Sequence, residues 1–198
     1  MSYSDANNKT LARSGTLLGA VYAAAFAAII AVCAWIHISP FGGVPFTLQT
    51  FGVFTALLFL GGQGGTLGVT LYLLLGAVGL PVFAGFTGGF AAMLGVTGGY
   101  ITGFLLGALA FWGIETLAKA FGFYGRLSRT SGLAACLVVC YLFGTCWFAY
   151  VHEGALSFAN LTSALSVCVV PFIVPDLAKM ALALLLYDRL MPVLSKIR

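Results

Sequence analysis

Hydrophobic positions run in long blocks along this chain, and polar positions gather in the short stretches between them. No charged side chain occurs from Ser14 to Ile114. The first apolar block, 14–36, has 23 residues, which at about 1.5 Å per residue can span a hydrocarbon core of about 30 Å. The block is longer than the apolar core of a cleavable signal peptide and is followed by further apolar blocks, so we expect a retained helix.

The pattern predicts six apolar helices, at 14–36, 48–61, 66–80, 99–118, 131–150 and 161–187. Four glycines around Gln63 predict a tight turn between the second and third of them. The expected fold class is therefore an all-α membrane protein built as a six-transmembrane-helix bundle. Its length suits one integral-membrane domain over residues 1–198.

Composition excludes a soluble protein, because 61% of the residues are hydrophobic and only 7% are charged, against about 25% charged in soluble domains. The five cysteines all fall in predicted helices, where cysteine packs as a small hydrophobe. Cys136 and Cys140 share a helix face, but no histidine lies near them in sequence to complete a metal site, so we expect no metal and no cofactor. The net charge of +4 does not indicate nucleic-acid binding, because the cations follow the membrane topology instead.

Eight of the nine lysines and arginines flank the predicted helices on one side of the membrane. They are Lys9, Arg13, Lys119, Arg126, Arg129, Arg189, Lys196 and Arg198. The loops expected on the other side, 37–47, 81–98 and 151–160, contain no lysine or arginine. By the positive-inside rule, the N and C termini are predicted to be cytoplasmic.

The ninth cation, Lys179, lies inside the last apolar block, three residues after Asp176. This spacing puts both side chains on one face of a helix. Each charge near the bilayer centre costs about 2.5–3.5 kcal/mol on insertion scales. The pair either stabilises the bundle by itself or faces a ligand, and we favour a ligand because desolvation often offsets the attraction within buried pairs.

Two outer loops are predicted to form the walls of a binding pocket beside this pair. The candidate residues are Thr47, Gln49, Phe83, Gly98, Gly99 and Tyr100. The two glycines would let a ligand approach the backbone, and the two aromatic rings would offer flat apolar surface. Helix capping by Thr47 and Gln49, and an interfacial aromatic belt that includes Phe83 and Tyr100, remain alternatives.

The first predicted helix carries small residues at every fourth position. Ala20, Ala24 and Ala28 form one row, and a neighbouring row runs from Gly19 to Ala31. Small residues at this spacing let helix backbones approach closely inside a membrane. The rows are interpreted either as internal packing surfaces or as a docking face for another membrane subunit.

Four stretches of the sequence, taken together, resemble the BioY family, the biotin-binding S components of energy-coupling-factor (ECF) transporters. These are Pro45–Thr50 (PFTLQT), Leu75–Ala84 (LGAVGLPVFA), Thr97–Tyr100 (TGGY), and Pro171-Phe172 followed by Asp176 and Lys179. The likeness covers nearly the whole chain and is weakest from about 120 to 165. Val96 departs from the family pattern, which usually has proline there.

The resemblance implies a multi-pass protein of the bacterial plasma membrane that captures biotin from outside. It implies three partners, a membrane T subunit and two cytoplasmic ATPases, with the T subunit on one of the small-residue rows of the first helix. Biotin would place its ureido N–H groups on Asp176 and its carbonyl on Lys179, or in the reverse pose its carboxylate on Lys179. The chain itself has no P-loop motif.

Three other functions stay open at this point. The chain could be an S component for another vitamin, or an autonomous biotin carrier that works without partner subunits. A membrane enzyme is the third alternative, and the sequence offers no nucleophile–base pair for it. We therefore expect a binding protein and not an enzyme.

Overall fold

The structure is a computed structural model that describes residues 3–38, 45–154 and 156–194. The long helices are α1 (Tyr3–Trp35), α2 (Gln49–Ala77), α4 (Gly98–Ala120), α5 (Arg126–Glu153) and α7 (Val170–Leu194). The short elements are β1 (His37–Ile38), β2 (Phe46–Thr47), η1 (Ala84–Phe86), α3 (Phe90–Leu94) and α6 (Phe158–Cys168). By length and composition, five of the described helices are able to cross a membrane, which confirms the prediction of a helical membrane protein.

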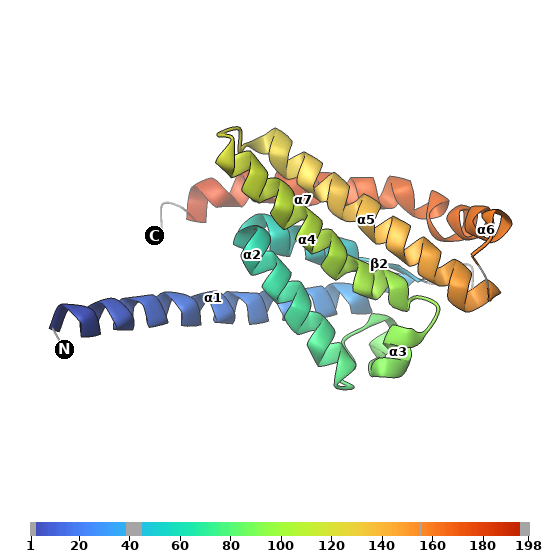
Figure 1. Cartoon of the computed structure of the whole chain (residues 1–198), viewed down its shortest axis with the longest axis horizontal. Coiled ribbons are helices and arrows are strands. Elements are labelled where there is room, and N and C mark those ends of the chain that lie inside the picture. Colours follow the sequence, from blue (N-terminus) through green and yellow to red (C-terminus); the bar gives the residue numbers. More distant parts are fainter. Residues whose placement is uncertain (1–2, 39–44, 155, 195–198) are drawn as a thin grey trace.

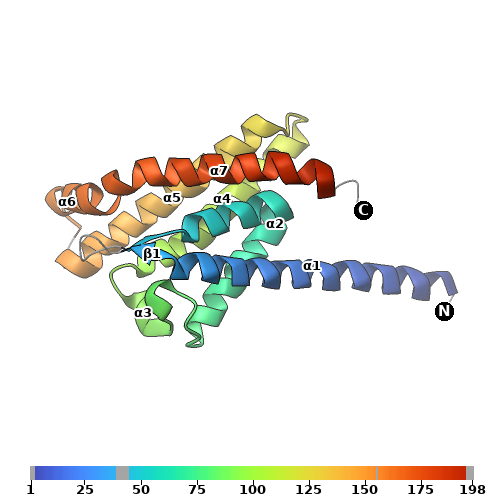
Figure 2. The same cartoon turned by 180° about the vertical axis from the view of Figure 1, so that it is seen from behind.

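Helix α2 contains both the second and the third predicted segments. Gly61 has a non-helical backbone, with φ 73° and ψ 175°. A Cβ atom placed on Gly65 would lie 2.7 Å from the Cα of Leu57, whereas residues eight apart in a straight helix are about 12 Å apart. The chain therefore reverses at Gly61, and the two halves of α2 form a V whose arms touch near the bend (Figure 2). The predicted break between the two segments is present. Its non-helical backbone is at Gly61, however, and not spread over a five-residue turn.

The predicted segment 161–187 is wrong as a single helix, because α6 ends at Cys168 and α7 begins at Val170. Pro171 lies in the first turn of α7, where its missing N–H would have no helical partner in any case. Helix α6 lies beside the ends of α5 and α7 (Figure 1), and α7 continues through Pro175 to Leu194.

The start of α1 and the end of α7 lie toward the same end of the molecule as the connection between α4 and α5 (Figure 1). The short strands, α3 and α6 lie toward the opposite end. The charge pattern predicts that the end with the termini faces the cytoplasm, and this orientation stays a prediction. The loop predicted at 37–47 lies partly outside the described residues.

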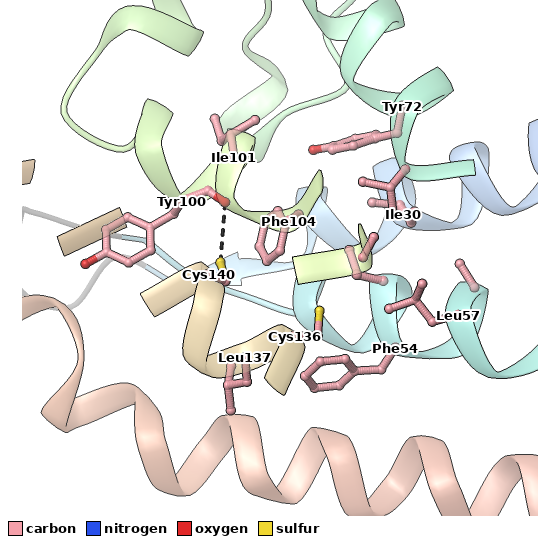
Figure 3. Close-up of a cluster of buried hydrophobic side chains, with 14 of the residues drawn as sticks. Ile30, Phe54, Leu57, Tyr72, Tyr100, Ile101, Phe104, Cys136, Leu137 and Cys140 are labelled. Atoms are coloured by element: carbon pink, nitrogen blue, oxygen red, sulfur yellow. Dashed lines mark hydrogen bonds between the residues drawn. The ribbon is translucent and has the colours of Figure 1, made fainter. Parts of the chain in front are cut away.

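Glycines bring α4 and α5 into close contact. A Cβ on Gly99 would lie 2.2 Å from Cβ of Trp147, and one on Gly107 would lie 2.5 Å from the carbonyl oxygen of Cys136. The buried cluster beside this contact is shown in Figure 3, where the Cys140 thiol donates to the carbonyl of Tyr100 at 3.5 Å. The close approach places the start of α4 directly against α5. The cavity described below is lined by residues from both of these helices.

The two small-residue rows of α1 face different surroundings. Ala23, Ala27 and Ala31 are buried, and α1 packs mainly against α2. A Cβ on Gly68 of α2 would lie 3.3 Å from the carbonyl oxygen of Ala23, so the backbones are close there. Ala20, Ala24 and Ala28, on the neighbouring row, are exposed.

Candidate substrate-binding site

A cavity of about 400 Å³ lies at the end of the bundle that carries the short strands and α3. Its walls come from the start of α2, the start of α4, the middle of α5 and α7, and the connection between α2 and α4. Its volume is within the range of small-molecule sites, and its lining is mainly apolar with a few polar groups. This is the arrangement by which proteins enclose and orient a small organic molecule.

Asp176 lines the cavity from α7 and is 4% exposed. Its Oδ1 accepts hydrogen bonds from Lys179 Nζ at 2.8 Å and from Thr50 Oγ1 at 3.0 Å. Its Oδ2 accepts one from the Tyr141 hydroxyl at 2.6 Å. A carboxylate has about four acceptor positions, so these three bonds leave one on Oδ2 for a ligand donor.

Lys179 lies one helical turn further along α7 and is 6% exposed. Besides the bond to Asp176, its ammonium group donates to the carbonyl oxygen of Thr47 at 2.6 Å and to Thr50 Oγ1 at 3.3 Å. It also lies 4.2 Å from the centre of the Phe46 ring. All three N–H groups of the ammonium therefore have acceptors within the protein.

The charge pair thus has features of both predicted interpretations. Asp176 and Lys179 neutralise each other, as a self-contained ion pair would, and both line the cavity, as a ligand-facing pair would. A fully paired charge removes most of the penalty for burying either group alone. The site therefore presents a strongly polar but electrically neutral patch in an apolar chamber.

Thr47 and Gln49 lie in the cavity lining and also help to start α2. The Thr47 hydroxyl accepts a hydrogen bond from the backbone N–H of Gln49 at 3.2 Å, which satisfies one free donor at the helix end. The Gln49 side chain donates to the Tyr72 hydroxyl at 2.9 Å. Thr47 therefore combines a local bond at the start of α2 with a place in the cavity, whereas the Gln49 side chain caps no helix end among the described residues.

The two predicted aromatic residues line the cavity and do not form a belt on the surface. Phe83 is 1% exposed and packs edge-on against Tyr72, with ring centres 5.5 Å apart. Tyr100 is 9% exposed, and its hydroxyl lies 3.2 Å from Thr145 Oγ1. Phe86, from the same loop as Phe83, is 62% exposed and stacks on Trp35 outside the cavity.

Gly98 and Gly99 are not among the cavity-lining residues. A Cβ on Gly98 would lie within 1.8 Å of the carbonyl oxygen of Met93, and Gly99 contacts Trp147. The two glycines allow the chain to turn into α4 and α4 to pack on α5. They support Tyr100, which follows directly in the lining.

Several lining residues are absent from the sequence-based prediction. The most important are Thr50 and Tyr141, because both hydrogen-bond to Asp176. Thr50 is the last residue of the stretch PFTLQT and directly follows Gln49, so the motif already pointed to it. Tyr141 gave no signal, because a tyrosine within an apolar helix fits a membrane-surface position equally well. Phe104, Cys140, Cys168 and Phe172 complete the apolar wall around the pair.

Comparisons with known proteins identify the family of this chain. The sequence model of the BioY family matches residues 7–196. The biotin transporter BioY of Thermotoga maritima is 43% identical over 171 residues, covering 86% of this chain and 94% of the relative. The probable biotin transporter BioY of Pyrococcus horikoshii is 41% identical over 167 residues, covering 84% of this chain and 92% of the relative.

A solved structure is similar along most of the chain. It is a crystal structure of the S-component for biotin from an ECF-type ABC transporter, with a TM-score of 0.75 and 26% identity. The match covers 89% of this chain and 92% of that chain. With the family match over nearly the whole sequence, these findings establish that the chain is a multi-pass membrane protein of the BioY family.

Proposed function

We propose that this protein is the biotin-binding S component of an ECF-type vitamin uptake transporter, and that biotin binds in the cavity beside Asp176 and Lys179. The observation that carries the proposal is the neutral, fully buried charge pair in the lining of an otherwise apolar chamber. The names of the relatives and of the similar structure support biotin as the ligand. The protein binds and hands over its substrate, with no chemistry of its own.

The chemistry of biotin suits the polar groups of the cavity. Its ureido ring is neutral and carries two N–H donors beside one carbonyl acceptor. The free acceptor position on Oδ2 of Asp176 can take one ureido N–H in a charge-assisted hydrogen bond. Lys179 can donate to the ureido carbonyl if it gives up its longest contact, the 3.3 Å one to Thr50.

The valerate carboxylate of biotin is best placed at the mouth of the cavity. Lys179 is the cation among the described lining residues, and its charge is already matched by Asp176. A second buried carboxylate beside the pair would have no further cation and would carry the cost of desolvation. The ring system then lies against the apolar wall that includes Phe83, Tyr100 and Phe104.

In the membrane, the two halves of α2 act as two separate passes, because the chain reverses between them at Gly61. With α1, α4, α5 and α7 this makes six passes and leaves both termini on one side. The positive-inside rule assigns that side to the cytoplasm. The cavity then opens toward the outside, where biotin is captured.

The exposed row of Ala20, Ala24 and Ala28 on α1 is the proposed contact for the T subunit, since a row of small side chains lets another helix approach closely. The buried row that includes Ala23 and Ala27 is already occupied by α2. A bulky Ala24→Trp substitution should abolish co-purification with the T subunit and leave biotin binding intact. Ala159→Trp, at an exposed site on α6, is the matched control.

Titration of the purified protein with biotin tests the function directly. Saturable binding, competed by unlabelled biotin and not by thiamine, is the expected result. Equal competition by thiamine would instead indicate an S component for a different vitamin. Biotin uptake by cells with and without the T subunit and ATPases then separates a partner-dependent subunit from an autonomous carrier.

A further inference from the structure

A second buried carboxylate, Glu115 on α4, lies far from the cavity and has no part in the proposed binding of biotin. Its side chain is only 6% exposed. It follows Tyr100 by fifteen residues along α4, so it lies about 22 Å away along the helix axis. Burying a carboxylate at this depth is costly unless its oxygens are well paired, so its partners indicate what it does.

The partners of Glu115 tie together three parts of the molecule. Oε2 accepts a hydrogen bond from the backbone N–H of Gly62 at 2.6 Å. Oε1 accepts from the Tyr124 hydroxyl at 2.9 Å and from Lys119 Nζ at 3.0 Å. Gly62 is the first residue after the reversal at Gly61, so its N–H is a free donor at the start of the second half of α2. Glu115 thus caps that half-helix from a neighbouring helix.

The glycines at the reversal are fitted to this contact. Gly61 has a φ of 73°, which favours glycine. A Cβ on Gly62 would lie 2.6 Å from the Cα of Trp112 and 2.8 Å from Oε2 of Glu115. The absence of side chains lets α4 reach the backbone where α2 turns, so Glu115 holds the apex of the α2 reversal.

The apex controls how the two halves of α2 meet at the cavity. Gln49 stands at the far end of the first half, and its hydrogen-bond partner Tyr72 belongs to the second half. Thr50, which bonds both Asp176 and Lys179, also belongs to the first half. That half is about 18 Å long, so a tilt of about 5° at the apex moves Gln49 and Thr50 by about 1.5 Å. Displacements of this size are enough to weaken a binding site.

We infer that Glu115 is a positioning residue for the substrate site. Its hydrogen bond to Gly62 fixes the angle between the halves of α2, and through that angle it places Gln49 and Thr50 in the cavity. The identity of the ligand rests on the proposed function, whereas the placement of the two residues does not.

Glu115→Ala and Glu115→Gln test this role in the full-length protein in lipid nanodiscs. Two quantities are measured, the hydrogen exchange of the Gly52–Ala56 amides without ligand and the dissociation constant for biotin. Glu115→Ala should speed exchange at Gly52–Ala56 as well as beside Gly62, and should weaken biotin binding between about twofold and thirtyfold. Glu115→Gln keeps an oxygen that can accept the Gly62 N–H. Its exchange at Gly52–Ala56 and its biotin affinity should therefore lie closer to those of the wild type than the values for Glu115→Ala do.

Two control variants separate positioning from a general loss of stability. Lys119→Ala removes the exposed partner of the same carboxylate and should change neither quantity much, since its side chain is 55% exposed. Leu133→Ala removes a fully buried side chain from α5, which packs mainly against α4, and lowers thermal stability. It should leave biotin affinity below the melting temperature near that of the wild type.

The inference is overturned if Glu115→Ala keeps wild-type exchange at Gly52–Ala56 and wild-type affinity. It is also overturned if Leu133→Ala, at an equal loss of thermal stability, weakens binding and speeds this exchange equally. If the wild-type protein does not bind biotin, the proposed function fails while the exchange measurement still decides the role of Glu115.

Discussion

The hydroxyl of Tyr141 on α5 donates a 2.6 Å hydrogen bond to Oδ2 of Asp176 on α7. This is the carboxylate oxygen that Lys179 and Thr50 do not bind. Tyr141 therefore holds in place the one oxygen with a free acceptor position, and it lines the cavity beside it. The orientation of the proposed biotin acceptor depends on a helix other than the one that carries it.

Tyr141→Phe should weaken biotin binding by about tenfold or more, because a hydrogen bond to a charged group contributes about 1.5–3 kcal/mol. The ring remains, so the shape of the cavity is kept. Isothermal titration of both proteins measures the change. Tyr150→Phe, at an exposed position of the same helix, is the control and should bind as the wild type does. Equal affinities for all three proteins would remove Tyr141 from the site.

Removing one charge of the buried pair should affect both folding and binding. Lys179→Met leaves Asp176 buried without its cation and should destabilise the protein by about 3–5 kcal/mol. Both Lys179→Met and Asp176→Asn should abolish biotin binding. The double variant Asp176→Asn/Lys179→Met has no uncompensated charge, so it should regain much of the thermal stability without regaining binding. A double variant that bound biotin normally would show that the pair is purely structural.

Gly76→Ala should narrow the cavity by displacing the ring of Phe83. A Cβ on Gly76 would lie 2.0 Å from Cζ of Phe83, so the ring has to move, and Phe83 lines the cavity. We expect a loss of biotin affinity of about tenfold, equivalent to about 1.4 kcal/mol. Adding Phe83→Leu should restore part of it, because the smaller side chain frees the space.

The control for this pair of variants is Gly113→Ala on α4, where a Cβ would contact nothing within 4 Å. Its biotin affinity should match that of the wild type. Retained binding in Gly76→Ala would mean that Phe83 does not form a wall of the occupied site.

The membrane orientation is tested with single cysteines in a background without the native ones. Phe123 belongs to the connection between α4 and α5, at the end of the molecule predicted to be cytoplasmic, and Leu156 precedes α6, which lies toward the opposite end; both residues are exposed. A thiol reagent that cannot cross the membrane should label Leu156→Cys in intact cells, and Phe123→Cys only after the cells are opened. The opposite labelling pattern would reverse the topology and place the cavity on the cytoplasmic side.

The sequence predicted which residues line the cavity better than it predicted how those residues interact. Asp176, Lys179, Thr47, Gln49, Phe83 and Tyr100 all line one cavity, as expected. Gly98 and Gly99 do not, because a glycine beside a functional residue serves helix packing as readily as ligand approach. The separate helix α6 was also missed, since its apolar residues continue into those of α7 with only Val169 between them.

The sequence by itself determined that the chain is a membrane protein with one charged pair in its apolar interior. Those conclusions follow from the cost of each charge in a bilayer, which depends on composition and order along the chain. Only the tertiary structure decided which groups satisfy that pair, because Tyr141, Thr50 and the Thr47 carbonyl come from segments far from α7 in sequence. Likewise, the sequence of α1 does not show which of its faces packs inward. The packing of α1 against α2 buries Ala23 and leaves Ala24 exposed.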